Sequence, residues 1–450
     1  MPSPCTLLFL FFFFSLCVSS PDLLLDQQES DHLYAVLSSL NPSVDWRSDY
    51  PDDLCTSGPH GVVCEPLGDS LRVVELSFGY VSDYSNNPPC HPSNASFSPS
   101  LSRFPFLSKL FFYRCFTNSS LVSLPSFLWS LGPQLQELVF EDNPAIAGPL
   151  SADIANLTGL RRLIISGSNL SGLIPQTIAA LSQVQQIDLS GNRLTGPIPP
   201  AVGNLTELIV LDLSRNQLTG PLPPELGQLS KATKLDLSFN NISGEIPASL
   251  GELRGLEMFV LSNNSINGGL PLFLGRMQGL RDLHLGGNPL GGTLPDVWTQ
   301  LAGLVSLDLA YTGLVGIIPA SMARLRNLTY LSLDHNGLTG AIPSGLGGLP
   351  LIHDLDLSYN RLSGQVPFRE EVVERLGPKL KLAGNDGLCL GSKMVGAGLV
   401  RVDVNGCISS NLAESLARDS SAVSSRGSRL GSDSWYGVAL ALLPAYLLTL

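Results

Sequence analysis

Residues 187–200 read IDLSGNRLTGPIPP, and residues 211–224 read LDLSRNQLTGPLPP, the same pattern displaced by 24 positions. The pattern recurs at residues 235–248 (LDLSFNNISGEIPA), 259–272 (FVLSNNSINGGLPL), 283–296 (LHLGGNPLGGTLPD), 307–320 (LDLAYTGLVGIIPA), 331–344 (LSLDHNGLTGAIPS) and 355–368 (LDLSYNRLSGQVPF). Counted from their leading position, nine units start 24 residues apart, at Leu160, Val184, Leu208, Ala232, Leu256, Leu280, Leu304, Leu328 and Ile352. Such a fixed period is typical of a solenoid, in which each repeat packs against its neighbours.

The apolar positions of a unit indicate how the units stack. Positions 1, 4, 6, 11 and 15 are apolar, as in Leu208, Leu211, Leu213, Leu218 and Leu222. Positions 4 and 6 flank a mostly polar position 5, which is the period of a strand with one buried face. We therefore predict a right-handed superhelix of about eleven repeats, with looser units at Leu107, Leu135 and Gly377, and a parallel β-sheet on its concave face.

Position 9 is an asparagine in most units. An inward amide has donors and an acceptor for backbone groups left open where the strand turns away. Glycine at position 13 and proline at position 16 mark the turn and the return on the outer side. Ser168 and Thr312 replace the asparagine, so we expect those two rungs to be looser or to use another donor. The asparagines are Asn192, Asn216, Asn240, Asn264, Asn288, Asn336 and Asn360.

Both ends of the chain are apolar. The uncharged run LLFLFFFFSLCV at residues 7–18 favours a secretory signal peptide over residues 1–20. Residues 435–450 (WYGVALALLPAYLLTL) form a short apolar tail behind a polar spacer, which is the pattern of a glycolipid (GPI) attachment signal. Ser420, Ser421 and Ser424 are the candidate attachment residues; a short spanning helix or an ordinary apolar tail are the alternatives.

Six cysteines and eight sequons are consistent with secretion. Six cysteines allow fifteen pairings, and their clustering makes the local pairs the simplest: Cys55 with Cys64, Cys90 with Cys115, and Cys389 with Cys407. Free buried thiols are the alternative. The Asn-x-Ser/Thr sequons, candidates for glycosylation, are Asn94, Asn118, Asn156, Asn169, Asn204, Asn241, Asn263 and Asn327.

Three further stretches carry a family resemblance. The LxxLxLxxNxLxGxIP pattern, with Trp46 and the Cys55–Cys64 spacing, resembles plant-type leucine-rich repeats and their N-terminal cap, although His60 stands where that cap commonly has Trp. VVELSFG (73–79), LFFYRC (110–115) and VPFREEVVERLGPKLKLAGNDGLC (366–389) resemble the kinase-free, Too Many Mouths-like receptor-like proteins, in particular a lipid-anchored relative. The resemblance implies cell-surface recognition, often of secreted peptides together with a receptor kinase.

The expected organisation follows from these features. An N-terminal cap covers residues 21–106, leucine-rich repeats 107–376, a C-terminal cap 377–410, a polar spacer 411–434 and the apolar signal 435–450.

No motif for catalysis or for a cofactor is present in the sequence. Kinase VAIK, HRD and DFG stretches, a GxSxG elbow and an HExxH pair are all missing. A net charge of −12 argues against nucleic-acid binding. His284 and His335 lie two rungs apart and in different columns, so a shared zinc site is not expected. We predict a protein that is not an enzyme and has no cofactor or metal.

Two sets of residues are candidates for the concave face. Position 5 carries Asp188, Asp212, Asp236, Asp308 and Asp356, which either solvate the sheet, attract a basic ligand or, as a remote third reading, act as paired carboxylates. In the units where the repeat sequence departs from its usual pattern, positions 3, 5 and 8 become apolar or aromatic. Such residues indicate an interface, and ordinary sequence variation at surface positions is the alternative. These candidates for ligand or partner binding are Phe239, Met258, Val260, His284, Tyr311, Tyr330, His335 and Tyr359.

Three functions are compatible with these features. The first is a co-receptor on the outer face of the plasma membrane, binding a secreted peptide, a receptor-kinase ectodomain, or both. The second is a secreted inhibitor of pathogen wall-degrading enzymes, similar to the polygalacturonase inhibitors, against which the apolar tail argues. The third is a passive wall or adhesion scaffold.

Overall fold

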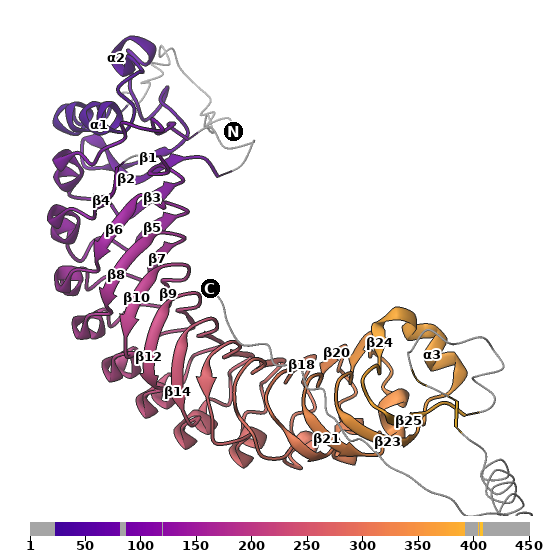
Figure 1. The fold of residues 1–450 in the computed structure, drawn as a ribbon. Coiled ribbons are helices and arrows are strands. Elements are labelled where there is room, and N and C mark those ends of the chain that lie inside the picture. The colour runs from indigo at the N-terminus through magenta and orange to yellow at the C-terminus, as the bar shows by residue number, and fades with distance from the viewer. Residues whose placement is uncertain (1–22, 82–86, 119, 392–403, 405, 408–450) are drawn as a thin grey trace, which may run out of the picture. The chain divides into compact units, whose positions relative to one another are not determined.

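The computed structural model describes residues 23–81, 87–118, 120–391, 404 and 406–407 (Figure 1). The chain divides into two compact units between Asn405 and Gly406, and the first unit contains the repeats. The expected signal peptide, the spacer with Ser420, Ser421 and Ser424, and the apolar tail lie outside the described residues. Within the described ranges, no helix has the length and apolar character needed to cross a membrane.

The N-terminal region combines two helices with a hairpin. Helix α1 (Gln27–Leu40) starts where the Asp26 carboxylate accepts hydrogen bonds from the N–H groups of Gln28 and Glu29. Helix α2 (Trp46–Asp49) buries the Trp46 ring, whose Nε1–H donates to the carbonyl of Asn41 at 3.0 Å. Strand β1 (Val62–Leu67) pairs antiparallel with β2 (Ser70–Gly79), and β2 pairs parallel with β3 (Lys109–Tyr113). The segment expected as a cap therefore also supplies the first parallel strand of the repeats.

One long sheet contains a short strand from each turn of the chain. It has fourteen strands, and every pair after β1–β2 is parallel (Figure 1). Leu211 lies opposite Ile187 and Leu235, so equivalent positions of successive units stack as the 24-residue period predicts. The remaining strands are β5 (Glu137–Glu141), β7 (Arg162–Ser166), β9 (Gln186–Asp188), β11 (Val210–Asp212), β13 (Lys234–Asp236), β15 (Met258–Val260), β17 (Asp282–His284), β18 (Ser306–Asp308), β20 (Tyr330–Ser332), β22 (Asp354–Asp356) and β24 (Leu380–Lys381).

A second row of strands returns along the other side of the core. Its first section is β4 (Val122–Ser123), β6 (Ile146–Pro149), β8 (Asn169–Leu173), β10 (Arg193–Gly196), β12 (Gln217–Pro221), β14 (Asn241–Gly244) and β16 (Ser265–Ile266). Its second section is β19 (Val315–Ile317), β21 (Gly337–Gly340), β23 (Arg361–Gln365) and β25 (Gly387–Cys389). The two sections share no strand pair in the described residues, so the row is interrupted between β16 and β19.

Short 3₁₀ helices close most units, and helix α3 (Glu370–Leu376) follows the last complete repeat. Most of the 3₁₀ helices begin directly after the proline of position 16. They are η1 (Pro99–Arg103), η2 (Ser126–Leu131), η3 (Ala152–Asn156), η4 (Gln176–Ala180), η5 (Pro200–Asn204), η6 (Pro224–Gln228), η7 (Ala248–Glu252), η8 (Leu272–Arg276), η9 (Trp298–Gln300), η10 (Ala320–Arg324), η11 (Ser344–Gly348) and η12 (Gly377–Lys379).

The apolar positions form one continuous core between the sheet and the return strands. A single cluster of buried side chains extends from Leu25 to Leu390. Leu208, Leu211 and Leu213 are each at most 1% exposed, as positions 1, 4 and 6 require. Each unit therefore buries its apolar side chains only by stacking on the next.

The asparagines of position 9 connect successive rungs. The Oδ1 of Asn216 accepts from the Leu194 N–H at 3.0 Å, while its Nδ2 donates to the carbonyls of Leu189 at 2.8 Å and Leu213 at 3.1 Å. Each amide thus satisfies backbone groups in its own rung and in the preceding one, which confirms the predicted role.

The two substituted rungs differ in the predicted way. The Thr312 hydroxyl donates to the Leu309 carbonyl at 2.8 Å, and the Leu290 N–H donates to the Asn288 carbonyl instead of to a side-chain amide. The return strand is missing from the preceding rung, where Thr293 makes only an isolated bridge to Val315 of β19. The Ser168 hydroxyl makes only a long bond of 3.4 Å to the Ser166 carbonyl.

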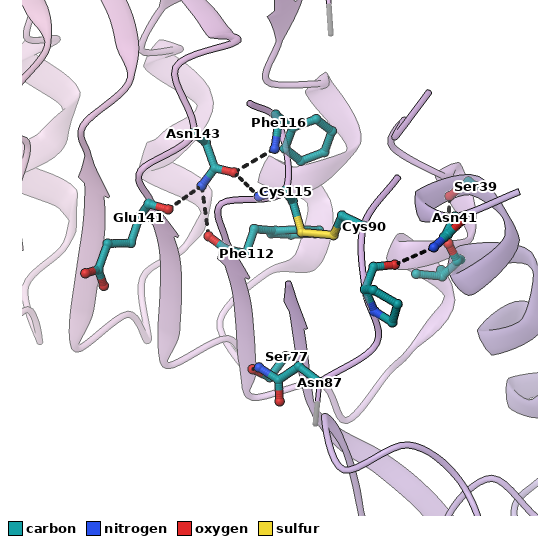
Figure 2. Close-up of a disulfide and its surroundings, with 12 residues drawn as sticks. Ser39, Asn41, Ser77, Asn87, Cys90, Phe112, Cys115, Phe116, Glu141 and Asn143 are labelled. Atoms are coloured by element: carbon teal, nitrogen blue, oxygen red, sulfur yellow. Dashed lines mark hydrogen bonds between the residues drawn. A yellow bond between two sulfur atoms is a disulfide. The ribbon is translucent and has the colours of Figure 1, made fainter. Parts of the chain in front are cut away.

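Disulfides lie near both ends of the repeats. Cys55 pairs with Cys64 and Cys90 with Cys115, as local pairing predicts, and Cys389 and Cys407 are disulfide-bonded as well. Figure 2 shows Asn143 beside the Cys90–Cys115 bridge, with its Oδ1 accepting from the N–H groups of Cys115 and Phe116. The bridge therefore links the N-terminal region to the turn at Cys115, and Asn143 of the following rung hydrogen-bonds to the same turn.

Candidate functional site

The aspartates of position 5 are built into the turns that end the strands. In each, Oδ1 accepts a hydrogen bond from the backbone N–H two residues further on. The pairs are Asp188–Ser190 (2.9 Å), Asp212–Ser214 (3.1 Å), Asp236–Ser238 (3.1 Å), Asp308–Ala310 (3.0 Å) and Asp356–Ser358 (3.1 Å). A carboxylate in this position shapes its own turn. The geometry therefore favours a structural role for the acidic column over a continuous surface for a basic ligand.

Lysines neutralise part of this column. Lys234 Nζ lies 2.7 Å from an oxygen of Asp212, and Lys381 Nζ lies 2.8 Å from an oxygen of Asp356. The hydrogen bond that Lys381 donates to Asp356 raises the pKa of Lys381. No lysine or arginine of the described chain lies within salt-bridge distance of Asp308, whose pKa burial raises. Burial also raises the pKa of Asp188. Asp308 is thus a half-buried carboxylate without a lysine or arginine partner in the described residues, and His284, in register on the preceding strand, lowers its pKa less than burial raises it.

Position 8, the first residue after each turn, has a left-handed backbone in every rung. Glycine fills it at residues 167, 191, 287 and 384, but Arg215, Phe239, Asn263, Tyr311, His335 and Tyr359 occupy it with φ between 53° and 58°. A bulky side chain in this region is unusual and costs about 1 kcal/mol relative to an ordinary backbone. Backbone hydrogen bonds hold the column, because the N–H of position 8 donates to the position-7 carbonyl of the next rung.

Three of these side chains stack into a ladder. The His335 ring lies 4.1 Å from the Tyr311 ring and 4.3 Å from the Tyr359 ring, with interplanar angles of 11° and 23°. Tyr311 and Tyr359 are 58% and 55% exposed. His335 Nδ1 is hydrogen-bonded to Asp334 Oδ2 at 2.8 Å, which fixes the middle ring. We call Tyr311, His335 and Tyr359 the aromatic ladder.

The other candidates on this face do not join the ladder. Phe239 is separated from it by two rungs and stacks under the Arg215 guanidinium, 4.6 Å from the ring centroid. Met258 and Val260 lie half-buried on β15, and Val260 pairs in register with His284. His284 Nε2 shares a hydrogen bond of 2.8 Å with the Ser306 hydroxyl. Tyr330 lies half-buried on β20, where burial raises its pKa.

An apolar strip on the same sheet face was not foreseen. Phe111, Val139 and Ile164 lie in register on β3, β5 and β7 and form a small cluster separate from the main core, with Tyr113 packed against it. The sequence contains a signal for this strip, because LFF, LVF and LII are continuous apolar runs, typical of strands buried on both faces. Five of the later rungs carry aspartate at this position, and three others carry Val260, His284 and Ser332.

The candidate modification sites are distributed over several parts of the structure. Asn94, Asn118, Asn156, Asn204, Asn241, Asn263 and Asn327 are exposed, and Asn169 is half-buried. Only Asn263 belongs to the position-8 column. The structure contains no group of three or more His, Cys, Asp or Glu side chains that could hold a metal ion within the ranges it describes.

Comparison with known proteins identifies the same repeats. The Leucine rich repeat family model matches residues 302–362, and a second Leucine Rich Repeat model matches 183–205, 207–229 and 231–253. The chain is 39% identical over 137 residues to Protein TOO MANY MOUTHS of Arabidopsis thaliana, covering 30% of this chain and 27% of that one. It is 37% identical over 173 residues to Receptor like protein 29 of the same plant, covering 37% and 36%. The matches thus span about a third of the length of these relatives.

Among solved structures, the chain resembles the Arabidopsis receptor kinase HAESA in complex with the peptide hormone IDA and the co-receptor SERK1. The TM-score is 0.61 at 28% identity, covering 81% of this chain and 62% of HAESA. The stacked strands, the column of position-9 asparagines (the asparagine spine) and the family matches define a leucine-rich-repeat solenoid. Its homologues are plant leucine-rich-repeat receptor-like proteins, among them TOO MANY MOUTHS and Receptor like protein 29.

Proposed function

We propose that this protein is a cell-surface co-receptor without catalytic activity of its own. It binds a secreted peptide, a receptor-kinase ectodomain, or both, through the face of the long sheet. Signal output then depends on the kinase of the partner.

The aromatic ladder is the observation that carries the proposal. Exposed, stacked aromatic rings are typical of interface anchors, since they offer large contact areas at low conformational entropy. They stand on the left-handed backbone that position 8 has in every rung, which brings their rings into one column.

The comparisons support the same class of function. HAESA, which this solenoid resembles over most of the described residues, is a receptor kinase seen with a peptide hormone and a co-receptor. TOO MANY MOUTHS and Receptor like protein 29 are relatives over about a third of their length. A place on the outer face of the plasma membrane, held by a glycolipid at Ser420, Ser421 or Ser424, completes the proposal.

Binding experiments with ladder variants test the proposal. The full-length, tagged chain is expressed in plant cells and measured against a panel of Arabidopsis receptor-kinase ectodomains, with and without apoplastic peptide fractions. The test variant carries Tyr311→Asn, His335→Asn and Tyr359→Asn, because asparagine tolerates the left-handed backbone. The matched control is Leu272→Asn, which removes a 74% exposed side chain from η8.

The proposal predicts that at least one ectodomain binds and that the triple variant weakens binding at least tenfold, while the control does not. Equal weakening by both variants, or a folded wild-type chain that binds no panel member, would overturn it. Treating intact cells with a phosphatidylinositol-specific phospholipase tests the anchor, since release is expected of a lipid-anchored receptor. A chain found only in the medium would instead favour a secreted inhibitor.

A further inference from the structure

We propose that a notch beside the aromatic ladder binds an arginine side chain of the partner. The notch is formed by the free face of the Tyr311 ring, the side-chain-free residues Gly286 and Gly287, and the Asp308 carboxylate. This inference rests on the proposed function and specifies the chemistry of the ligand.

The gap arises where the position-8 column loses its side chain. His335 covers one face of Tyr311, and the preceding rung has Gly287 at the equivalent place. The Gly287 N–H donates to the Ala310 carbonyl at 2.8 Å, so the two turns lie side by side. Within the described residues no ring or guanidinium stacks on the other face of Tyr311, although Phe239 has Arg215 in that role. The column therefore ends in an open aromatic face.

Side chains of the neighbouring rungs form the sides of the proposed notch. Asn263 leans over the glycine from the preceding rung, with Oδ1 2.7 Å from the point where a Cβ of Gly287 would stand. The Asp308 oxygens lie 2.9 Å and 3.0 Å from the corresponding point of Gly286. The Asp308 carboxylate thus borders the place of a Gly286 side chain, and the Asn263 amide borders that of a Gly287 side chain.

The negative charge of Asp308 favours a cationic ligand group in the notch. Asp212 and Asp356 each have a lysine, whereas Asp308 has the Ala310 N–H and, in register on the preceding strand, the His284 imidazole. Because a half-buried carboxylate without a lysine or arginine is incompletely compensated, a positively charged group from outside would be stabilised there. A guanidinium can stack flat on a tyrosine ring and present two N–H donors to one carboxylate, which an ammonium cannot do. Arginine therefore fits both walls of the notch.

Saturation-transfer NMR with a short peptide tests the inference. The probe is acetyl-Gly-Ser-Arg-Ser-Gly-amide, and the matched peptide has citrulline, a neutral isostere, in place of arginine. Both are measured against the purified full chain and against its Ser265→Ala variant, which cannot carry a glycan on Asn263. The protein variants are Asp308→Asn, which keeps the acceptor for the Ala310 N–H, and Tyr311→Asn; Asp236→Asn, three rungs away in the same column, is the control.

We expect saturation of the arginine side-chain protons, at least tenfold weaker binding of the citrulline peptide, and a similar loss in Asp308→Asn and Tyr311→Asn but not in Asp236→Asn. An arginine preference in either glycoform that depends on Asp308 supports the notch. No preference, or an equal loss in Asp236→Asn, overturns it. Capture of a receptor ectodomain by the ladder would stand in that case, so failure of the notch and failure of the proposed function are separable.

Discussion

Replacing Asn240 by alanine perturbs the asparagine spine at its centre. Its Oδ1 accepts from the Leu218 N–H at 2.9 Å, and its Nδ2 donates to the carbonyls of Leu213 and Leu237 at 3.0 and 3.1 Å. The two carbonyls keep a donor each, because Asn216 also reaches Leu213 and Asn264 also reaches Leu237. The Leu218 N–H loses its amide acceptor.

The expected loss of stability follows from the different fates of these groups: the Leu218 N–H loses its acceptor, whereas the two carbonyls keep a donor each. A buried N–H left without its partner costs about 1–3 kcal/mol, and the weakened carbonyl bonds add about 0.5 kcal/mol each. We therefore expect Asn240→Ala to lower the free energy of unfolding by about 2–4 kcal/mol. Urea unfolding followed by circular dichroism measures the loss, and hydrogen exchange of residues 213–220 locates it. The exposed neighbour change Gln217→Ala should stay within about 0.5 kcal/mol. A loss below about 1 kcal/mol with unchanged protection of Leu218 would refute the role of the spine.

Further predictions concern the cap, the glycines and pH. The double change Cys55→Ser and Cys64→Ser, which opens a loop of sequence separation 9, should reduce the free energy of unfolding by about 2.5 kcal/mol in urea melts; an unchanged midpoint would contradict it. Gly227→Ala should cost more than about 1 kcal/mol, since its Cβ would stand 2.4 Å from the Ser249 carbonyl oxygen, whereas Gly348→Ala, with no atom within 4 Å, should be nearly neutral. Because burial raises the pKa of Asp308 above 3.8, its contribution to stability is full below that pH and is lost as the pH rises through the raised value. Asp308→Asn should therefore gain stability relative to wild type as the pH rises above about 4, and a loss of stability relative to wild type over the same change would rule out this cause.

The repeats are readable from the sequence because each buried position obeys a period. Leu211, Leu213 and Asn216 have the burial and the bonds that their positions predict, since the same local geometry returns every 24 residues. The changed hydrogen bonds at Thr312 were also predictable, because this rung lacks the asparagine amide of position 9.

The candidate site was predictable only in part. The sequence predicts that Tyr311 and His335 share a face, but not that they stack, since this depends on the left-handed turn of position 8. The glycines at 167, 191 and 287 in that position are a usable signal for such a backbone. The sequence leaves the role of the acidic column open for a related reason: Asp212 bonds to its own turn and to Lys234, which no pattern of single residues reveals.

The central claim is that the face bearing the aromatic ladder is the binding surface. Hydrogen–deuterium exchange of the full chain, alone and saturated with a receptor-kinase ectodomain that it binds, tests this most directly. We expect slower exchange on binding in the strands and turns at residues 306–312, 330–336 and 354–360. Protection confined to the 3₁₀ helices η4–η8, with no change in those three segments, would contradict it.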